Sequence, residues 1–356
     1  MAAVTSQPPV LEGLPPRILV AGGAGFIGSA FVRLLLGLED GPQVTVLDKL
    51  TYAGNLRNLE EVEAHPRYRF VQGDICERDL ADQLAAEVDC IVNFAAESHV
   101  DRSILDPDAF IRTDVYGTYS LLEAARRHQH RRFLQVSTDE VYGDVDAPRL
   151  SVESDPIRPR SPYSASKAGA EMQCFAYHAT YGLPVVVTRG SNTYGPFQYP
   201  EKIVPLFITQ ALDGRPLPVY GDGGAVRDYL YVDDHALGIA VALAGGRPGS
   251  AYNLGQGDPP LNGLQVADAV LELVGASAEL IQHVADRPGH DRRYALDSSR
   301  ARELGWSPQM DFRAGMARTV AWYRQRRDWW EPIKSGEFLE FYRRNYRPLQ
   351  QAGPAT

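Results

Sequence analysis

Cysteine is scarce in this sequence, and its few occurrences show no regular spacing. The three cysteines, Cys76, Cys90 and Cys174, are too far apart in the chain to match a metal-ligand pattern. They cannot all pair with one another, which suits a reducing compartment. The sequence therefore predicts no metal site, and it predicts a cytoplasmic location.

Long apolar runs and an excess of basic residues are missing as well. No run of about 18 apolar residues exists, so no segment is expected to span a membrane. Residues 1–16 lack a basic start and an apolar core, and we interpret them as a flexible leader; residues 348–356 are interpreted as a flexible tail. The net charge of −9 argues against a nucleic-acid or anionic-membrane partner. An anionic small molecule in a local basic pocket remains possible.

What is present is a regular alternation of short apolar strands and amphipathic helices. We expect strands at residues 17–21, 43–48, 68–72, 89–94, 133–136 and 183–188, and helices at 29–36, 77–86, 108–128 and 312–323, with a further C-terminal helix within 329–346. This order predicts an α/β fold with a Rossmann-type doubly wound parallel sheet. The expected NAD-binding domain covers residues 17–190, with excursions of the main sheet beyond 190. A smaller mixed α/β substrate-binding portion is expected mainly over 191–347.

A glycine-rich turn follows the first predicted strand. Gly22-Gly-Ala-Gly-Phe-Ile-Gly28 has the spacing G-x-x-G-x-x-G and leads into a predicted helix. Such glycines let the backbone approach a pyrophosphate at the helix N-terminus, although a plain turn is the alternative. Asp48 ends the second strand 20 residues after Gly28. A carboxylate there hydrogen-bonds the ribose hydroxyls and repels a 2′-phosphate, so the predicted cofactor is NAD.

Residues after the next strands are candidates for the rest of a dinucleotide site. Thr51 and Gly54 lie in a loop that could touch the adenosine, and Asp74 could meet the adenine amino group. For Asp74, capping of the following helix is an equally good interpretation. Ala95 and Ala96 leave room for a flat ring at the carboxyl end of the fourth strand, where ligands bind in open parallel sheets.

The segment Ser161-Pro-Tyr-Ser-Ala-Ser-Lys167 places a phenol and an ammonium four residues apart at the start of a predicted helix. Residues at i and i+4 share one helix face, so Tyr163 and Lys167 can point into the same cleft. A nearby ammonium favours the phenolate and lowers a pKa that is normally about 10. We therefore predict a general base; a surface pair on an amphipathic helix is the alternative.

Two adjacent carboxylates follow the fifth predicted strand, within Ser137-Thr-Asp-Glu-Val-Tyr-Gly143. Two neighbouring acids in a closed site do not ionise equally, so one tends to keep its proton while the other stays basic. Thr138, Asp139 and Glu140 are thus candidates for combined acid and base chemistry. The alternative is a polar turn with solvated carboxylates.

The second half of the chain has less regular alternation and more candidate binding loops. The segment 286–293 is a dense basic loop in an acidic protein, and its arginines would suit a diphosphate. A solvated surface loop is the ordinary alternative. The other candidate segments are 199–202, 217–220, 227–228 and Asn262.

Taken together, these motifs resemble a known family. GGAGFIG, Asp48, AAESHVD, STDEVYG, the Tyr163/Lys167 pair, SNTYGP, PEK and RPGHDRRY occur in the order found in extended short-chain dehydrogenases/reductases. The sequence is most similar to the dTDP-glucose 4,6-dehydratase family, over about residues 17–347.

The resemblance implies a lyase that oxidises C4 of dTDP-glucose with bound NAD, eliminates water across C5 and C6, and returns the hydride to C6. By this comparison Tyr163 takes the C4 hydroxyl proton, and Lys167 binds the nicotinamide ribose. Glu140 removes the C5 proton, Asp139 donates a proton to the leaving C6 hydroxyl, and Thr138 holds the C4 oxygen. The implied product is a 4-keto-6-deoxy sugar nucleotide used in deoxysugar biosynthesis.

The motifs and the resemblance together give two sets of binding residues. The predicted cofactor site comprises Gly22, Gly25, Phe26, Ile27, Gly28, Asp48, Lys49, Thr51, Gly54, Asp74, Ile75, Phe94, Ala95, Ala96, Ser98, Thr113, Ser137, Tyr163, Lys167 and Thr193. The predicted substrate site comprises Ser98, His99, Thr138, Asn192, Lys202, Ile203, Pro218, Val219, Tyr220, Arg227, Asn262, Asp286, Arg287 and His290. The resemblance also implies a homodimer joined through helices at 108–128 and 164–181.

Three positions depart from the family pattern. Gly190 stands where a cysteine is usual, Thr193 replaces an asparagine near the nicotinamide, and Asp114 replaces another asparagine. None of these changes removes a group that the implied mechanism requires. They lie close enough to the expected nicotinamide site to bear on the identity of the sugar.

Two classes of alternative function remain at this point. A decarboxylase of dTDP- or UDP-glucuronate and a C4 epimerase share the C4 oxidation, but neither needs an acid pair, so Asp139 and Glu140 favour dehydration. Relatives that dehydrate UDP-N-acetylglucosamine typically have lysine where Glu140 stands. A non-catalytic NAD-binding regulator would tend to lose the pair formed by Tyr163 and Lys167, which this chain retains.

Overall fold

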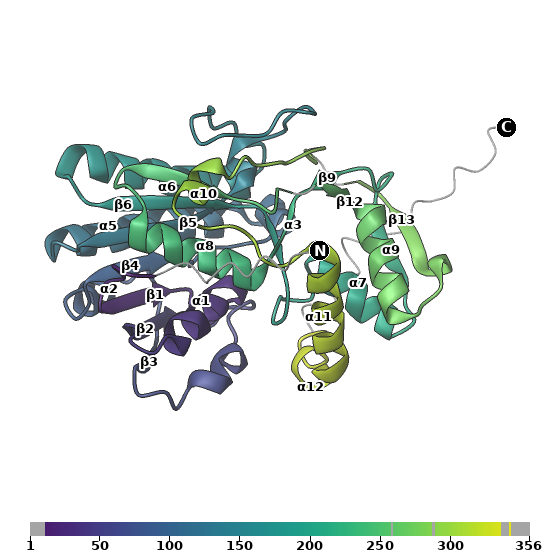
Figure 1. Ribbon diagram of the computed structural model, residues 1–356, viewed down its shortest axis with the longest axis horizontal. Helices are drawn as coiled ribbons and strands as arrows, with labels where there is room; N and C mark the ends of the chain where they lie inside the picture. Colours follow the sequence, from purple (N-terminus) through teal and green to yellow (C-terminus); the bar gives the residue numbers. More distant parts are fainter. Residues whose placement is uncertain (1–10, 258, 287–288, 336–341, 343–356) are drawn as a thin grey trace, which may run out of the picture.

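A seven-stranded parallel sheet forms the centre of the first portion of the protein (Figure 1). The computed structural model describes residues 11–257, 259–286, 289–335 and 342. The strand order is β11-β6-β5-β4-β1-β2-β3. The strands are β1 (Arg17–Ala21), β2 (Gln43–Asp48), β3 (Tyr68–Gln72), β4 (Cys90–Asn93), β5 (Arg132–Thr138), β6 (Val185–Gly190) and β11 (Ser250–Leu254).

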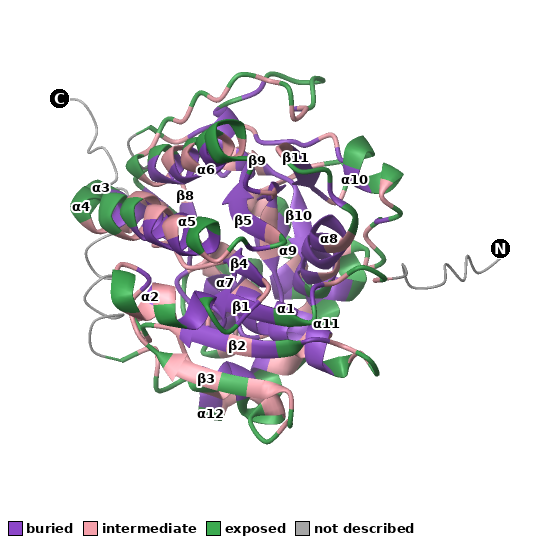
Figure 2. Cartoon of the chain, turned by 90° about the vertical axis from the view of Figure 1, so that its left-hand side faces the viewer, coloured by how far each residue is buried: buried purple, intermediate pink, exposed green. Residues whose placement is uncertain are grey.

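This order confirms the predicted fold class and locates a ligand site. The chain builds outward from β1 to β3, then returns to place β4 on the other side of β1. Loops leave in opposite directions at such a switch point, which opens a crevice at the carboxyl ends of the strands. Most residues of β1, β4, β5 and β6 are buried, as expected for strands covered on both faces (Figure 2).

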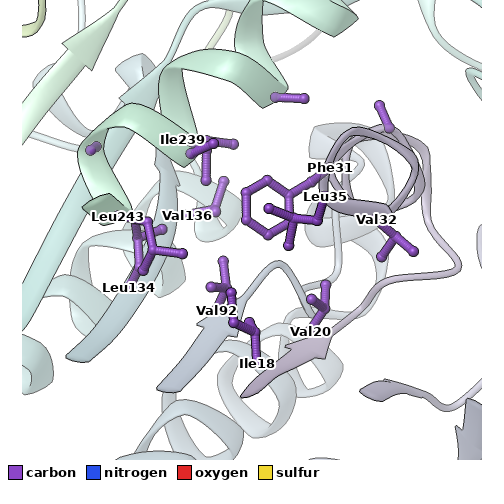
Figure 3. Close-up of a cluster of buried hydrophobic side chains, with 14 of the residues drawn as sticks. Ile18, Val20, Phe31, Val32, Leu35, Val92, Leu134, Val136, Ile239 and Leu243 are labelled. Atoms are coloured by element: carbon purple, nitrogen blue, oxygen red, sulfur yellow. The ribbon is translucent and has the colours of Figure 1, made fainter. Parts of the chain in front are cut away.

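Helices cover both faces of the sheet. α1 (Phe26–Gly37) and α8 (Val232–Gly245) pack on one face, where Phe31 and Ile239 meet strand residues such as Val20 (Figure 3). Burial of a side chain as large as Phe31 contributes roughly 2–3 kcal/mol. The opposite face carries α2 (Arg78–Ala85), α5 (Thr118–Arg127) and α6 (Pro162–Tyr181).

The predicted helix at 108–128 is not uniform. It consists of α4 (Pro107–Phe110), a π-helical segment η2 (Ile111–Gly117) and α5. The wider π-turn rotates the side chains that follow it, and such segments are frequent at functional sites. Thr113 and Asp114 lie within η2 and face the carboxyl ends of the strands.

A second portion has its own core. It contains α7 (Ile203–Leu212), α9 (Gly263–Val274), α11 (Phe312–Gln325) and α12 (Arg327–Trp330), with β8 (Leu217–Tyr220) paired parallel to β13 (Ile281–Val284). Trp329 and Trp330 are fully buried in this core, together with Phe207 and Tyr323. Of the predicted helix at 329–346, residues 336–341 and 343–346 lie outside the described residues. The domain boundary near residue 190 stays a prediction.

Short elements connect the two portions. β7 (Asn192–Tyr194) pairs parallel with β10 (Tyr229–Tyr231), and β9 (Val226–Arg227) pairs with β12 (Leu261–Asn262). The remaining elements are η1 (Leu56–Val62), α3 (Val100–Leu105), η3 (Asp139–Tyr142), η4 (Ala278–Leu280) and α10 (Ser299–Glu303). Within the described part of the chain, none of the helices has the length and apolar character needed to cross a membrane.

Candidate active site

Two adjoining hollows lie at the carboxyl ends of the strands. The first is lined by every residue of the predicted cofactor set, from the glycine turn at Gly22 to Thr193. The second lies between the sheet and the second portion. They share the wall formed by Glu140, Asn192, Thr193, Gln198 and Lys202. Ligands bound in the two hollows would therefore lie next to each other at this shared wall.

The glycine turn fits a bound pyrophosphate. Gly22 has a φ of +75°, and a Cβ there would lie 2.5 Å from the backbone nitrogen of Ala95. A Cβ on Gly28 would lie 2.9 Å from the Cα of Gly23. Both positions thus require glycine. Gly25 precedes α1 without a side-chain cap, so the first N–H groups of that helix are available to an anion.

Asp48 is held rigidly at the end of β2. Its Oδ2 accepts a hydrogen bond from the backbone N–H of Ala24 and its Oδ1 accepts one from Leu50, both at 2.9 Å. Burial raises its pKa. A carboxylate has about four acceptor positions, so two remain for ribose hydroxyls. Gly54 packs against this carboxylate, where a Cβ would lie 2.7 Å from Oδ1.

Within the protein, Asp74 bonds to Lys49 and Cys76 and does not cap the helix that follows it. Its Oδ2 forms a 2.7 Å ion pair with Lys49, and its Oδ1 accepts the N–H of Cys76 at 2.9 Å. Although burial alone would raise its pKa, these bonds bring it below the usual value. The residue that caps α2 is Glu77, so Asp74 closes the preceding turn. It nevertheless lines the first hollow.

Tyr163 and Lys167 enter the hollow from the first turns of α6. Ser161 caps this helix through reciprocal hydrogen bonds with Ser164, which fixes where the helix begins. Lys167 is buried and Tyr163 is half-buried, and Lys167 Nζ donates to the carbonyl of Val136 at 2.7 Å. The structure thus brings together the pair expected from its spacing, and the alternative of a surface pair is wrong.

In the protein alone the pKa of Tyr163 is raised, not lowered as we predicted from the nearby Lys167. Burial raises the pKa of Tyr163 well above its usual value, and the charge of Glu140 raises it further. A hydrogen bond with Thr138 acts in the opposite direction but does not reverse the result. Spacing indicates that an ammonium is near, but it does not reveal how many carboxylates face the same phenol.

The two adjacent acids have different surroundings. Thr138 donates to Asp139 Oδ1 at 3.2 Å and accepts the N–H of Glu140 at 3.3 Å, where β5 runs into η3. Asp139 is 3% exposed, and its Oδ2 has no hydrogen-bond partner among the described residues. Burial, and then the charge of Glu140, raise the pKa of Asp139 well above its usual value. Asp139 is therefore suited to hold a proton beside the second carboxyl group, Glu140.

Asp114 lies next to the pair formed by Tyr163 and Lys167. Its Oδ1 accepts the backbone N–H of Glu97 at 2.9 Å, and its Oδ2 accepts the Ser166 hydroxyl at 2.6 Å. Burial lowers the pKa of Lys167, and the charge of Asp114 acts against that shift without reversing it. The carboxylate thus provides a counter-charge for the buried ammonium that the usual asparagine lacks.

Replacing Asp114 with asparagine should change how stability depends on pH. Burial raises the pKa of Asp114 to about 6, above the unfolded value of about 3.9. The folded protein therefore keeps a proton between these values, and the stability from that proton is lost as pH rises through about 6. Asparagine cannot ionise. The free energy of unfolding of Asp114→Asn, relative to the unsubstituted protein, should rise by about 1 kcal/mol from about pH 5 to about pH 7.5.

Urea titrations at the two pH values measure this difference. Asp108→Asn, an exposed position on the same helical stretch, controls for the loss of one carboxyl group. Equal curves for Asp114→Asn and Asp108→Asn would contradict the pKa assigned to Asp114.

Most of the predicted substrate residues line the second hollow. Arg227 and His290 face it, together with His99, Asn192, Lys202, Ile203, Pro218, Val219 and Tyr220. Ser98 and Thr138 line the first hollow, and Lys202 also donates to the carbonyl of Ser98. The Tyr220 hydroxyl donates to Asp101 at 3.0 Å. These residues provide cationic and hydrogen-bonding groups next to the two acids.

Two predicted substrate residues, Asn262 and Asp286, are not part of this lining, and a third cannot be placed. Asn262 caps α9, where its Oδ1 accepts the N–H of Gln265 at 2.8 Å. Asp286 contacts His290 Nδ1 at 2.6 Å and positions that ring. Arg287 lies outside the described residues. The sequence motif indicated that the loop at 286–293 contributes to the site. It could not show which side chains of that loop bond to other protein groups instead of lining the hollow.

Several lining residues were missed from the sequence. Gly190, Ser191, Gln198 and His235 line the first hollow, and Gln198 also lines the second. The segment 190–196 was recognised as a family motif. The residues that the β7–β10 pairing brings next to it were not predicted. His235 follows β10 at the start of α8, where no local pattern separates it from an ordinary buried histidine.

Comparison with known proteins identifies the family. The sequence profile described as GDP-mannose 4,6 dehydratase matches residues 19–319. The dTDP-glucose 4,6-dehydratase of Streptomyces niveus is 52% identical, over 90% of this chain and 96% of that protein. The corresponding enzyme of Escherichia coli is 44% identical, over 94% and 100%.

Solved structures agree in both fold and sequence. The DesIV dTDP-glucose 4,6-dehydratase of Streptomyces venezuelae, crystallised with NAD, has a TM-score of 0.87 and 53% identity, over 89% of this chain and 100% of that one. A UDP-glucose 4-epimerase of Thermus thermophilus has a TM-score of 0.81 and 34% identity, over 87% and 99%. The chain therefore belongs to the GDP-mannose 4,6 dehydratase family, and within it to the dTDP-glucose 4,6-dehydratases.

Proposed function

We propose that the protein converts dTDP-glucose to dTDP-4-keto-6-deoxy-glucose. The observation that carries this proposal is that Asp139 and Glu140 line the same hollow as Tyr163 and Lys167, and that Glu140 also lines the second hollow. Oxidation alone would need only Tyr163 and Lys167. The two acids add the groups required to eliminate water, and the relatives with 52% and 53% identity carry that activity in their names.

NAD fits the first hollow, and when bound it supplies the hydride acceptor for oxidation of C4 and the hydride donor for reduction of C6. The glycine turn and the N-terminus of α1 would hold its pyrophosphate, and Asp48 its adenosine ribose. Ser137 Oγ is buried beside the hollow without a partner among the described residues, so it is available to a ligand. Lys167 would bind the nicotinamide ribose.

Tyr163 would take the proton of the C4 hydroxyl as the hydride leaves C4. Its raised pKa in the protein alone means that it must lose its proton when the cofactor and substrate are in place. A cationic ring close to the phenol lowers that pKa. Lys167 contributes to the same effect, and Thr138 would hold the C4 oxygen by a hydrogen bond.

Elimination then follows at the neighbouring carbons. The C4 ketone makes the C5 proton acidic, and Glu140 would remove it. Asp139, which keeps its proton because it is buried beside a second carboxylate, would donate that proton to the departing C6 hydroxyl, so the C6–O bond breaks as water leaves. Hydride is added at C6 and Glu140 returns the proton to C5. The products are water and the 4-keto-6-deoxy sugar nucleotide.

A product assay on a panel of sugar nucleotides tests the proposed function. Protein supplied with NAD and dTDP-glucose should release a 4-keto-6-deoxy product, detected by mass spectrometry as a loss of one water. UDP-glucose, dTDP-glucuronate and UDP-glucuronate serve as comparison substrates. Release of carbon dioxide from dTDP-glucuronate, with dTDP-glucose left untouched, would show a decarboxylase instead.

The proposal includes a homodimer through the helices of the opposite sheet face. Ile111 and Tyr116 on η2, and Met172 and Tyr181 on α6, are apolar side chains that are between 44% and 56% exposed. η2 and α6 pack side by side, so these residues can form one apolar surface. A four-helix contact between two copies would cover it.

Charge on that surface should separate the subunits. Ile111→Glu combined with Met172→Glu would place two carboxylates in the buried interface, where desolvation is costly. Sedimentation velocity should show a dimer for the unsubstituted protein and a monomer for this variant. Leu150→Glu changes an equally exposed leucine outside both helices and should remain dimeric. If the unsubstituted protein sediments as a monomer, the proposed homodimer is wrong.

A further inference from the structure

His235 is a buried side chain with one unused nitrogen at the edge of the first hollow. It is 2% exposed, and Nδ1 lies 2.7 Å from Thr193 Oγ1. Nε2 is buried and has no hydrogen-bond partner among the described residues, although His235 lines the hollow. A buried polar atom without a partner is costly, so a ligand group at this position would be stabilised.

The contacts of Thr193 are compatible with a His235 tautomer that carries its proton on Nδ1. The Thr193 hydroxyl has one proton, and the carbonyl of Ser191, 3.2 Å away, can only accept it. When Thr193 donates to Ser191, its oxygen accepts the Nδ1–H of His235. Burial lowers the pKa of His235 to about 4, so the ring is neutral at neutral pH. Nε2 then presents a bare lone pair and can accept a hydrogen bond from a ligand.

Gly190 leaves this nitrogen uncovered. A Cβ on Gly190 would lie 2.5 Å from His235 Nε2, so any side chain there would press on the imidazole. Gly190 also lines the hollow and pairs with Thr138 across β5 and β6. Without a side chain at this position, the Nε2 edge of the imidazole borders the same hollow as Thr138.

We propose that His235 positions the nicotinamide ring by accepting a hydrogen bond from the carboxamide NH₂ group at Nε2. This inference rests on the proposed function, because it concerns NAD. Tyr163 and Lys167 approach the hollow from α6, on one face of the sheet, whereas His235 comes from α8 on the other face. A nicotinamide bound between them would turn its reactive carbon toward Tyr163 and the sugar, and its carboxamide would then lie toward the end of β6.

Sugar hydroxyl groups are a poorer match for the same nitrogen. The groups assigned to the sugar, Thr138 and the two acids, lie at the end of β5 and in η3. His235 does not line the second hollow, whereas Glu140 and Thr193 line both. His235 is therefore a positioning residue for the cofactor. A fixed carboxamide holds one face of the ring toward C4 in the oxidation and toward C6 in the return step.

Affinities of the full-length protein, freed of bound nucleotide, for NAD and for ADP-ribose test the proposal. ADP-ribose lacks the nicotinamide, so it reports on the fold and on every other part of the site. His235→Asn keeps a polar atom near Thr193 but has none at the position of Nε2, and His235→Gln places an amide oxygen there. We expect His235→Asn to bind NAD about tenfold more weakly with unchanged ADP-ribose affinity, and His235→Gln to remain close to the unsubstituted protein.

An analogue and a second variant provide independent readouts. 3-Acetylpyridine adenine dinucleotide has no NH₂ donor, so the unsubstituted protein should prefer NAD to it, and His235→Asn should lose that preference. Gly190→Ala should weaken NAD binding but not ADP-ribose binding. Equal losses for NAD and ADP-ribose, or an undiminished preference for NAD in His235→Asn, would overturn the proposal. Failure of the unsubstituted protein to bind either nucleotide would instead refute the proposed function.

Discussion

Glu140→Gln is expected to slow the elimination of water by roughly 10²–10⁴-fold while C4 oxidation continues. Glutamine has the shape of the glutamate side chain but cannot accept the C5 proton. Removal of the Glu140 charge also takes away a cause of the raised pKa of Tyr163, so the first proton transfer should not be impaired. The substitution therefore separates the two stages of the reaction.

Single-turnover absorbance measures both stages. With stoichiometric NAD and dTDP-glucose, Glu140→Gln should accumulate reduced cofactor, seen as the near-ultraviolet absorbance of the dihydronicotinamide. It should release little dehydrated product. Asp146→Asn, an exposed carboxyl in the loop after η3, is the matched control and should react normally. Elimination at the normal rate in Glu140→Gln would show that another group removes the C5 proton.

Tyr163→Phe is expected to lower C4 oxidation itself by roughly 10²–10⁴-fold. Phenylalanine keeps the ring and its edge contact with Phe110, whose centroid is 6.3 Å away, so the helix should stay in place. What is lost is the oxygen that accepts the C4 hydroxyl proton. Neither reduced cofactor nor dehydrated product should appear.

The contrast between the two variants makes this prediction specific. In Tyr163→Phe, the absence of both product and reduced cofactor would place the defect at the oxidation step. In Glu140→Gln, reduced cofactor without product would place the defect at the elimination step. Tyr68→Phe, on β3, removes a phenol outside both hollows and should react normally. Unchanged accumulation of reduced cofactor in Tyr163→Phe would mean that Tyr163 is not the base for the C4 hydroxyl.

The sequence predicted the elements of the sheet well because buried parallel strands are continuous apolar runs. The bounds of β1, β2 and β3 are those expected. The bounds of β4, β5 and β6 differ from the predicted ones by one or two residues at each end. β5 extends to Thr138 and β6 to Gly190, because polar and glycine residues there complete the ladder instead of starting a loop.

The parts that could not be predicted depend on contacts between distant segments. The π-helical turn at Asp114 has no signature in its own residues. The raised pKa of Tyr163 depends on burial and on Glu140, which is 23 positions earlier in the chain. His235 is placed beside Gly190 by the packing of α8 on β6. Motif spacing therefore identified the reacting groups, but not the groups that tune and position them.

An isotope label tests the central claim most directly. dTDP-glucose carrying deuterium at C4 should give a 4-keto-6-deoxy product with the deuterium at C6, as measured by mass spectrometry and NMR in ordinary water. This result is expected because the hydride taken from C4 is returned within the same active site before the product leaves. A product with no deuterium at C6, or recovery of a C4 epimer with the label still at C4, would contradict the account.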